Sequence, residues 1–60
     1  MKYTELHRIF TRAGWQFVKQ DATSHRHYIK DGIKIIIPFH GAKEVPKGLL
    51  NKLLKDAGLK

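Results

Sequence analysis

Apolar side chains recur at helical spacing near the start of the chain. Between positions 4 and 13 they are Leu6, Ile9, Phe10 and Ala13. This spacing places them on one face of a helix with 3.6 residues per turn. Thr4 suits the N-cap of such a helix, and Gly14 suits the left-handed position that follows its last turn. The pattern therefore predicts an amphipathic helix over residues 4–13.

Short runs with strand character follow this helix. They cover residues 15–20, 25–30 and 33–38 and are rich in aromatic and β-branched side chains. The small polar residues 21–24 indicate a turn. Asp31-Gly32 between the last two runs is a strong hairpin signal, because both central positions of that tight turn need a positive φ. Pro38 ends the last strand, since proline cannot donate to a β-ladder.

The hairpin turn sets the register of the last two strands. A two-residue turn at Asp31-Gly32 pairs Lys30 with Ile33, and residues opposite one another share a face of the sheet. The predicted core face then carries Tyr28, Ile33, Ile35 and Ile37. The opposite side, called the open face below, carries His25, His27, Ile29, Lys34 and Ile36. We therefore expect His25 to point away from the core.

A second amphipathic helix is predicted at the end of the chain. After a loop over residues 40–45, Pro46 suits the first helical position and Gly58 the end. The apolar stripe between them consists of Leu49, Leu50, Leu53, Leu54 and Ala57. The simplest packing puts both helices on one sheet face, as an α+β two-layer sandwich with α-β-β-β-α order. With 60 residues, the chain has room for a single domain, 1–60.

The charge balance points to a polyanionic partner. Lysine and arginine total 12 against 5 acidic residues, a formal net charge of +7. Nucleic acid is the favoured partner, with an acidic protein, plain solubility and a membrane surface as alternatives, and charge alone does not separate RNA from DNA. No cysteine is present, which excludes disulfides and thiolate chemistry and suits the cytoplasm. No apolar run is long enough to span a bilayer, and no signal peptide is recognisable.

Several motifs together resemble those of a known family. They are Gly14-Trp15, Ser24-His25 at the start of a strand, the Asp-Gly hairpin, Pro38-Phe39-His40-Gly41, Pro46-Lys47-Gly48-Leu49-Leu50, and the terminal run from Leu53 to Leu59. Along nearly its whole length the chain resembles the HicA family of toxin–antitoxin systems. The resemblance implies a fold like the double-stranded-RNA-binding domain, an mRNA-cleaving activity and a HicB antitoxin.

The family's hallmark is a Gly-Ser-His triplet with a catalytic histidine. Here the triplet reads Thr23-Ser24-His25, so the serine and histidine are retained and the glycine is not. The resemblance implies that His25 is the catalytic residue. If the glycine position requires a positive φ, threonine would restrict the turn before the strand.

The chemistry of RNA cleavage suits histidine. The 2′-hydroxyl of RNA is the nucleophile, so the enzyme must move protons and stabilise charge on the phosphoryl group, and none of these steps requires a metal or another cofactor. Histidine titrates near neutrality and can act as general acid or base. We assign that role to His25, with an ordinary exposed strand histidine as the alternative. The candidates for RNA binding are Ser24, His27, Lys34, Lys43 and Lys47.

Other residues have ordinary explanations. His27 can equally be a solvated side chain; His25 and His27 form a His-x-His pair, but no other zinc ligand stands at a recognisable spacing. Lys43 and Lys47 can belong to a solvated basic flank. We expect His7 and His40 at the surface, and Trp15 in the core.

The interpretations differ in what the protein does with its partner. The first is a ribonuclease toxin, whose antitoxin we expect on the open face, where apolar side chains mix with positive charge. The second is a module that binds double-stranded RNA without cutting it. A basic DNA-binding or protein-binding domain is the third, and no recognition-helix or zinc-finger pattern supports it.

Overall fold

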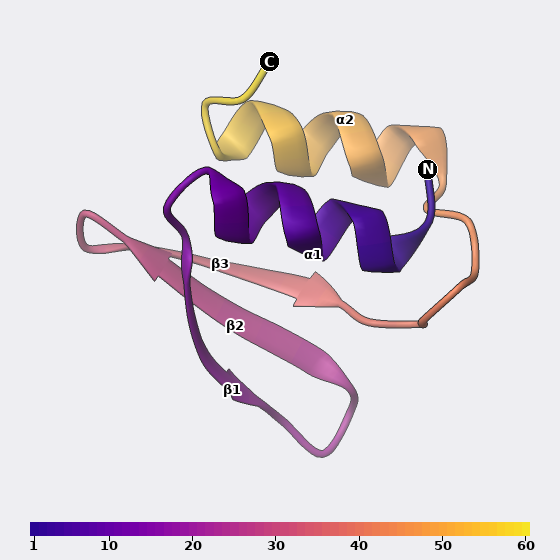
Figure 1. Ribbon diagram of the computed structural model, residues 1–60, viewed down its shortest axis with the longest axis horizontal. Helices are drawn as coiled ribbons and strands as arrows, with labels where there is room; N and C mark the ends of the chain where they lie inside the picture. Colours follow the sequence, from indigo (N-terminus) through magenta and orange to yellow (C-terminus); the bar gives the residue numbers. More distant parts are fainter.

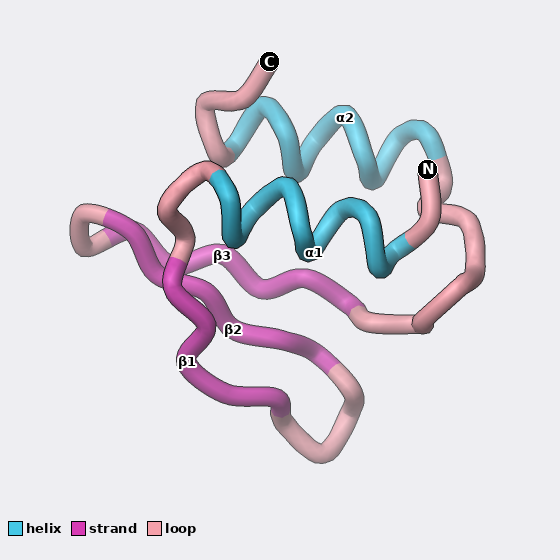
Figure 2. The backbone as a smooth tube through the Cα atoms, in the orientation of Figure 1, coloured by secondary structure: helices cyan, strands magenta, loops and turns pink.

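Two helices pack on one face of a three-stranded sheet in the computed structural model, which describes all 60 residues (Figure 1). The elements are α1 (Tyr3–Arg12), β1 (Gln16–Gln20), β2 (His25–Lys30), β3 (Ile33–Pro38) and α2 (Lys47–Asp56). The strands lie in the order β1-β2-β3, and both pairs are antiparallel. The two helices lie side by side above the sheet (Figure 2). The predicted α-β-β-β-α order is confirmed.

The hairpin between β2 and β3 has the predicted register. Asp31 and Gly32 have φ values of 51° and 78°, so both turn positions are left-handed. Lys30 pairs with Ile33, and the ladder continues without a shift to His25 opposite Pro38. β1 is less regular, because a β-bulge lies between Phe17 and Lys19. The Asp-Gly turn therefore determines which side chains share a face with His25.

The N-terminus of α1 differs from the prediction. Lys2, not Thr4, is the N-cap, and no side chain caps the helix. The backbone N–H groups of Tyr3 and Thr4 instead donate to the carbonyl oxygens of Lys43 and Gly41, at 3.1 and 3.2 Å. The loop after β3 thus satisfies donors that a polar cap would otherwise bind, and the prediction for Thr4 was wrong.

Glycines end both helices as predicted. At the end of α1, Gly14 has φ +95°, and the N–H of Trp15 donates to Phe10 O at 3.0 Å. Trp15 therefore belongs to the C-terminal motif of α1, and β1 begins one residue later than predicted. At the end of α2, Gly58 has φ +71°. Pro46 is the N-cap of α2 rather than its first helical residue.

One apolar core lies between the helices and the sheet. Its nine buried members are Tyr3, Leu6, Phe10, Trp15, Tyr28, Ile35, Ile37, Val45 and Leu53. The rest of the leucine stripe on α2 packs against this cluster. Ile33 was predicted on the core face, but the residue is 57% exposed. The β2–β3 hairpin turn, which Ile33 directly follows, extends beyond the ends of both helices (Figure 1).

His7 is buried, although we expected it at the surface. Its residue is only 4% exposed, with Nδ1 2.7 Å from the Tyr28 hydroxyl and Nε2 3.0 Å from Pro38 O. A carbonyl oxygen only accepts, so Nε2 carries the proton and Nδ1 accepts from Tyr28. Burial lowers the pKa of His7 below its usual 6.5. The ring is therefore a neutral link between α1, β2 and the end of β3.

Candidate active site at the start of strand β2

A tight turn after β1 places His25 on the open face, as the first residue of β2. The backbone N–H of Asp21 donates to His25 O at 3.0 Å and closes the loop of residues 21–24 between the strands. The carboxylate of Asp21 accepts the backbone N–H groups of Thr23 and His25 through Oδ1, at 2.9 and 3.1 Å. An aspartate that binds N–H groups a few residues ahead is a common turn device. Here it holds the loop against the first residue of β2.

Threonine in the triplet causes no backbone strain. The left-handed residue of this loop is Ser24, with φ 61°, and Thr23 is not among the residues with positive φ. A β-branched side chain is costly only in that left-handed region. The loop geometry therefore accepts Thr23 at the position where the resembled triplet has glycine.

The side chain of His25 faces away from the core, as predicted. It is 40% exposed, and its residue pairs with Pro38 at the end of β3. Its Nδ1 lies 2.7 Å from Thr23 Oγ1, and Thr23 Oγ1 donates to Asp21 Oδ1 at 2.5 Å. Nε2 makes no hydrogen bond within the chain. His25 thus has one nitrogen fixed by the protein and one available to a ligand.

His27 lies on the same face and binds the same carboxylate. Its Nε2 is 2.9 Å from Asp21 Oδ2. The Thr23 hydroxyl, then the His27 ring and then the backbone N–H of His25 hold the pKa of Asp21 well below its usual range. Asp21 therefore stays ionised near neutral pH and places a negative charge beside both histidines.

The other predicted binding residues lie further away or face elsewhere. Ser24 is next to His25, but it bonds through its backbone: its carbonyl accepts from Phe39 N at 2.9 Å. Lys34 is exposed and pairs with Ile29, four residue pairs along the hairpin from His25. At ~3.3 Å per residue that is about 13 Å. Lys34 therefore does not lie beside His25.

Lys43 and Lys47 extend the basic surface beyond the sheet. Both are exposed, Lys43 in the loop after β3 and Lys47 at the start of α2. That loop leaves β3 at Pro38, the residue paired with His25. These lysines make no contact with His25, so the structure supports them only as part of a broad positive surface.

Asp21 and Arg26 are the prominent side chains that the sequence prediction missed. In the sequence Asp21 looks like an ordinary turn residue. Its carboxylate accepts from the backbone N–H groups two and four residues later, which is a recognised Asx-turn pattern. Arg26 lies on the helix side of the sheet, with its guanidinium 3.7 Å from the centroid of the Phe39 ring and its Nε donating to Gln20. No spacing in the sequence indicates that contact.

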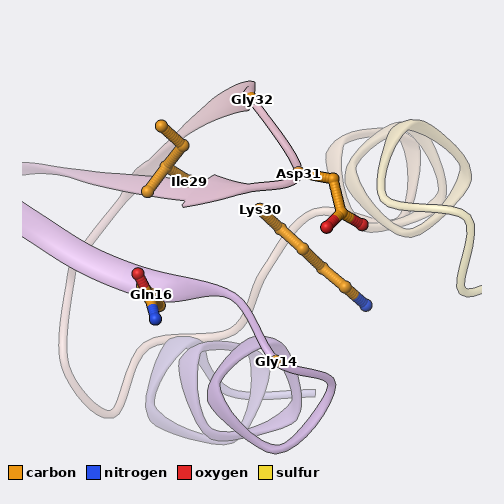
Figure 3. A pocket seen from close by; sticks show the side chains of 6 residues that line it. All are labelled: Gly14, Gln16, Ile29, Lys30, Asp31 and Gly32. Atoms are coloured by element: carbon orange, nitrogen blue, oxygen red, sulfur yellow. The ribbon is translucent and has the colours of Figure 1, made fainter.

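The pocket on the surface is remote from His25. Its volume is about 330 Å³, and its lining comes from Gly14, Gln16, Ile29, Lys30, Asp31 and Gly32 (Figure 3). These residues surround the hairpin turn, at the opposite end of β2. Lys30 Nζ donates to Ala13 O at the end of α1, at 2.6 Å, which gives this lysine a structural role.

No group of three or more His, Cys, Asp or Glu side chains could hold a metal ion. Neither helix is long and apolar enough to cross a membrane.

Together, the fold and the site define a small basic α+β domain in which His25 faces solvent and is oriented by hydrogen bonds from the turn before it. The family model described as the HicA toxin of bacterial toxin–antitoxin systems matches residues 3–59, and the chain belongs to this family. A "Probable mRNA interferase HicA" of Pseudomonas fluorescens is 37% identical over all of this chain and 98% of its own length. A "Probable mRNA interferase HicA 2" of Photorhabdus laumondii is 33% identical over the full length of both chains. No solved structure matches the chain at a significant level.

Proposed function

We propose that the protein is the toxin of a type II toxin–antitoxin system and cleaves mRNA with His25 as general acid and base, without a metal ion. The observation that carries this proposal is the state of the His25 ring: Nδ1 is held by the turn, and Nε2 has no partner within the chain. Family membership and the names of the two relatives support the substrate.

The reaction uses a nucleophile that the RNA supplies. Nε2 of His25 accepts the proton of the 2′-hydroxyl, whose oxygen attacks the adjacent phosphorus and displaces the 5′-oxygen. The departing oxygen then needs a proton, which a protonated imidazole can return. A positioned acid or base of this kind contributes roughly 10²–10⁴-fold to the rate. Charge that develops on the phosphoryl oxygens also needs cationic donors, and the exposed Lys34, Lys43 and Lys47 lie away from His25, where they suit the flanking phosphates of a bound RNA.

Replacing His25 with alanine tests the assignment. The His25→Ala protein should bind RNA but not cut it, and it should melt like the parent because the side chain faces solvent. His40→Ala is the matched control: His40 is an exposed histidine in the loop after β3, and this variant should cut RNA at the parental rate. Purified proteins are incubated with a structured RNA in EDTA. A folded His25→Ala protein that still cuts refutes the assignment.

The products report the nucleophile. Attack by the 2′-hydroxyl leaves a 2′,3′-cyclic phosphate or its hydrolysis product, and a 2′-deoxy nucleotide at the cut site should stop the reaction. A strict requirement for added Mg²⁺ or Zn²⁺ contradicts the metal-free mechanism. RNA that is bound with steep salt dependence but never cut would instead support the double-stranded-RNA-binding module.

A toxin that cuts messages in the cytoplasm of its own cell needs an inhibitor, and we propose a HicB-type antitoxin seated on the open face. Ile36 is 51% exposed there, beside basic Lys34. This mixture suits a partner that offers acidic groups around an apolar centre. Ile36→Glu and Lys34→Glu should weaken binding far more than Lys55→Glu on α2, as measured by three dissociation constants at one salt concentration. A larger loss at Lys55 would place the antitoxin on the helices.

A further inference from the structure

The hydrogen bonds behind His25 have a defined direction. The Thr23 hydroxyl lies between two polar atoms, 2.5 Å from Asp21 Oδ1 and 2.7 Å from His25 Nδ1. A hydroxyl has one proton to donate, and an ionised carboxylate can only accept. The Thr23 proton therefore points to Asp21, and the Thr23 oxygen accepts a proton from Nδ1 of His25.

This direction determines the tautomer of the neutral imidazole. With the proton on Nδ1, the lone pair lies on Nε2, the nitrogen that has no partner within the chain. Free histidine side chains in water favour the opposite tautomer, with the proton on Nε2. In that tautomer Nε2 has no free lone pair and cannot accept a proton. A partner at one ring nitrogen is how proteins set the state of the other.

His27 fixes the far end of the same chain of hydrogen bonds. Its Nε2 donates to Asp21 Oδ2 at 2.9 Å, while Oδ1 faces Thr23 and the backbone. The carboxylate is thus bound at both oxygens and cannot rotate away from Thr23. His27 is 25% exposed in its side chain and has its Nε2 engaged, so its role is to hold Asp21 rather than to move a proton at the phosphate.

We propose that Asp21 and Thr23 are positioning residues that hold His25 in the Nδ1–H tautomer, so that Nε2 is ready to accept the proton of the 2′-hydroxyl. The inference rests on the proposed function of His25. It also explains what the residue in the glycine position of the triplet contributes, since Thr23 supplies a hydroxyl that glycine lacks. We call this chain of hydrogen bonds, from Asp21 through the Thr23 hydroxyl to His25, the relay. It depends on the residues of the turn before β2.

The test removes the hydroxyl without changing the shape of the side chain. Thr23→Val keeps the β-branch and the backbone N–H that donates to Asp21, whereas Thr23→Ser keeps the hydroxyl. Thr11→Val is the matched control, because Thr11 is exposed on α1 and its hydroxyl donates only to His7 O, at 3.0 Å. Asp21 is left intact, since its carboxylate also holds the turn.

Two readouts separate positioning from folding. Long-range ¹H–¹⁵N NMR spectra at about pH 8, above the usual histidine range, should show His25 protonated on Nδ1 in the parent, Thr23→Ser and Thr11→Val proteins, and shifted towards Nε2–H in Thr23→Val. The value of kcat should fall roughly 10- to 100-fold in Thr23→Val, the scale of loss when the partner that orients a metal-bound histidine is removed. KM for RNA should stay unchanged, and Thr23→Ser should restore kcat.

The outcomes distinguish the relay from the function it serves. A parental His25 that carries its proton on Nε2 would overturn the relay, as would a Thr23→Val protein with parental kcat beside an inactive His25→Ala protein. In both cases the proposed function would stand. Parental cleavage by His25→Ala would instead overturn the proposed function, and the catalytic use of the relay with it.

Discussion

Replacing Tyr28 with phenylalanine should destabilise the protein far more than the removal of one oxygen atom suggests. The Tyr28 hydroxyl donates to Nδ1 of His7 at 2.7 Å, and both residues are buried. Burial raises the pKa of Tyr28, so the hydroxyl keeps its proton and remains a donor. Phenylalanine preserves the ring contacts with Phe10 and Phe17. The substitution therefore removes only the hydroxyl and leaves the buried Nδ1 of His7 without its donor.

The expected cost follows from that unpaired nitrogen. A buried polar atom that loses its only partner costs about 1–3 kcal/mol. A domain of this length is stable by roughly 3–9 kcal/mol, at about 0.05–0.15 kcal/mol per residue. For such small domains each kcal/mol lowers Tm by about 4–8 °C. A loss near the middle of the range, about 2 kcal/mol, should thus lower Tm by roughly 8–16 °C.

Urea and thermal unfolding of the parent and Tyr28→Phe proteins measure this effect. Phe17→Leu is a useful comparison, because Phe17 touches the Tyr28 ring but is 55% exposed and bears no polar group; it should cost well under about 1 kcal/mol. A Tyr28→Phe protein within about 0.5 kcal/mol of the parent would refute the reasoning. It would mean that water or a ring rotation satisfies His7 Nδ1.

Two further predictions concern pH and backbone conformation. Burial lowers the pKa of His7 below 6.5, so just below pH 6.5 the unfolded chain binds a proton on this residue and the native state does not. The stability that His7 contributes is therefore present above pH 6.5 and is lost as pH falls below it, by up to about 1.4 kcal/mol per pH unit. His7→Gln should flatten this part of the curve of unfolding free energy against pH. Gly14→Ala should lower the free energy of unfolding by about 1–2 kcal/mol, because φ is +95° there. Gly48→Ala should raise it by about 0.5–1 kcal/mol, because Gly48 lies in α2 and an added Cβ would meet no neighbouring atom. Calorimetry that shows the same sign of change for both variants would contradict the conformational argument.

The fold was predictable where local chemistry and periodicity agree. The Asp-Gly pair set the β2–β3 register correctly, and with it the outward direction of His25. The helices followed from their apolar spacing. The prediction failed where tertiary contacts replace local signals: carbonyl oxygens of the distant loop satisfy the start of α1, so Thr4 is not needed as a cap. Ile33 obeys the alternation of the strand but is 57% exposed, because it directly follows the hairpin turn at the end of the sheet.

The candidate site was predictable only in part, for a related reason. His25 came from its place in a recognisable triplet and in the hairpin register. Its partners depend on how the turn after β1 folds, which brings Asp21 and Thr23 to Nδ1. Nothing in the spacing of these residues indicates which oxygen meets which nitrogen. The burial of His7 was missed for the same reason. Histidine is polar, and the two groups that bond its ring come from β2 and the end of β3, far along the chain.

The buried and exposed histidines are connected through the end of β3. His7 Nε2 donates to Pro38 O on the core side, and Pro38 is the residue that pairs with His25. The next residue, Phe39, donates its N–H to Ser24 O in the loop that orients His25. The end of β3 is thus bound to α1 on one side and to the turn on the other. The candidate site lies on the open face of the sheet, where neither helix packs against it (Figure 1). The neutral His7 ring supports this site from behind, because it anchors the strand against which the His25 turn is built.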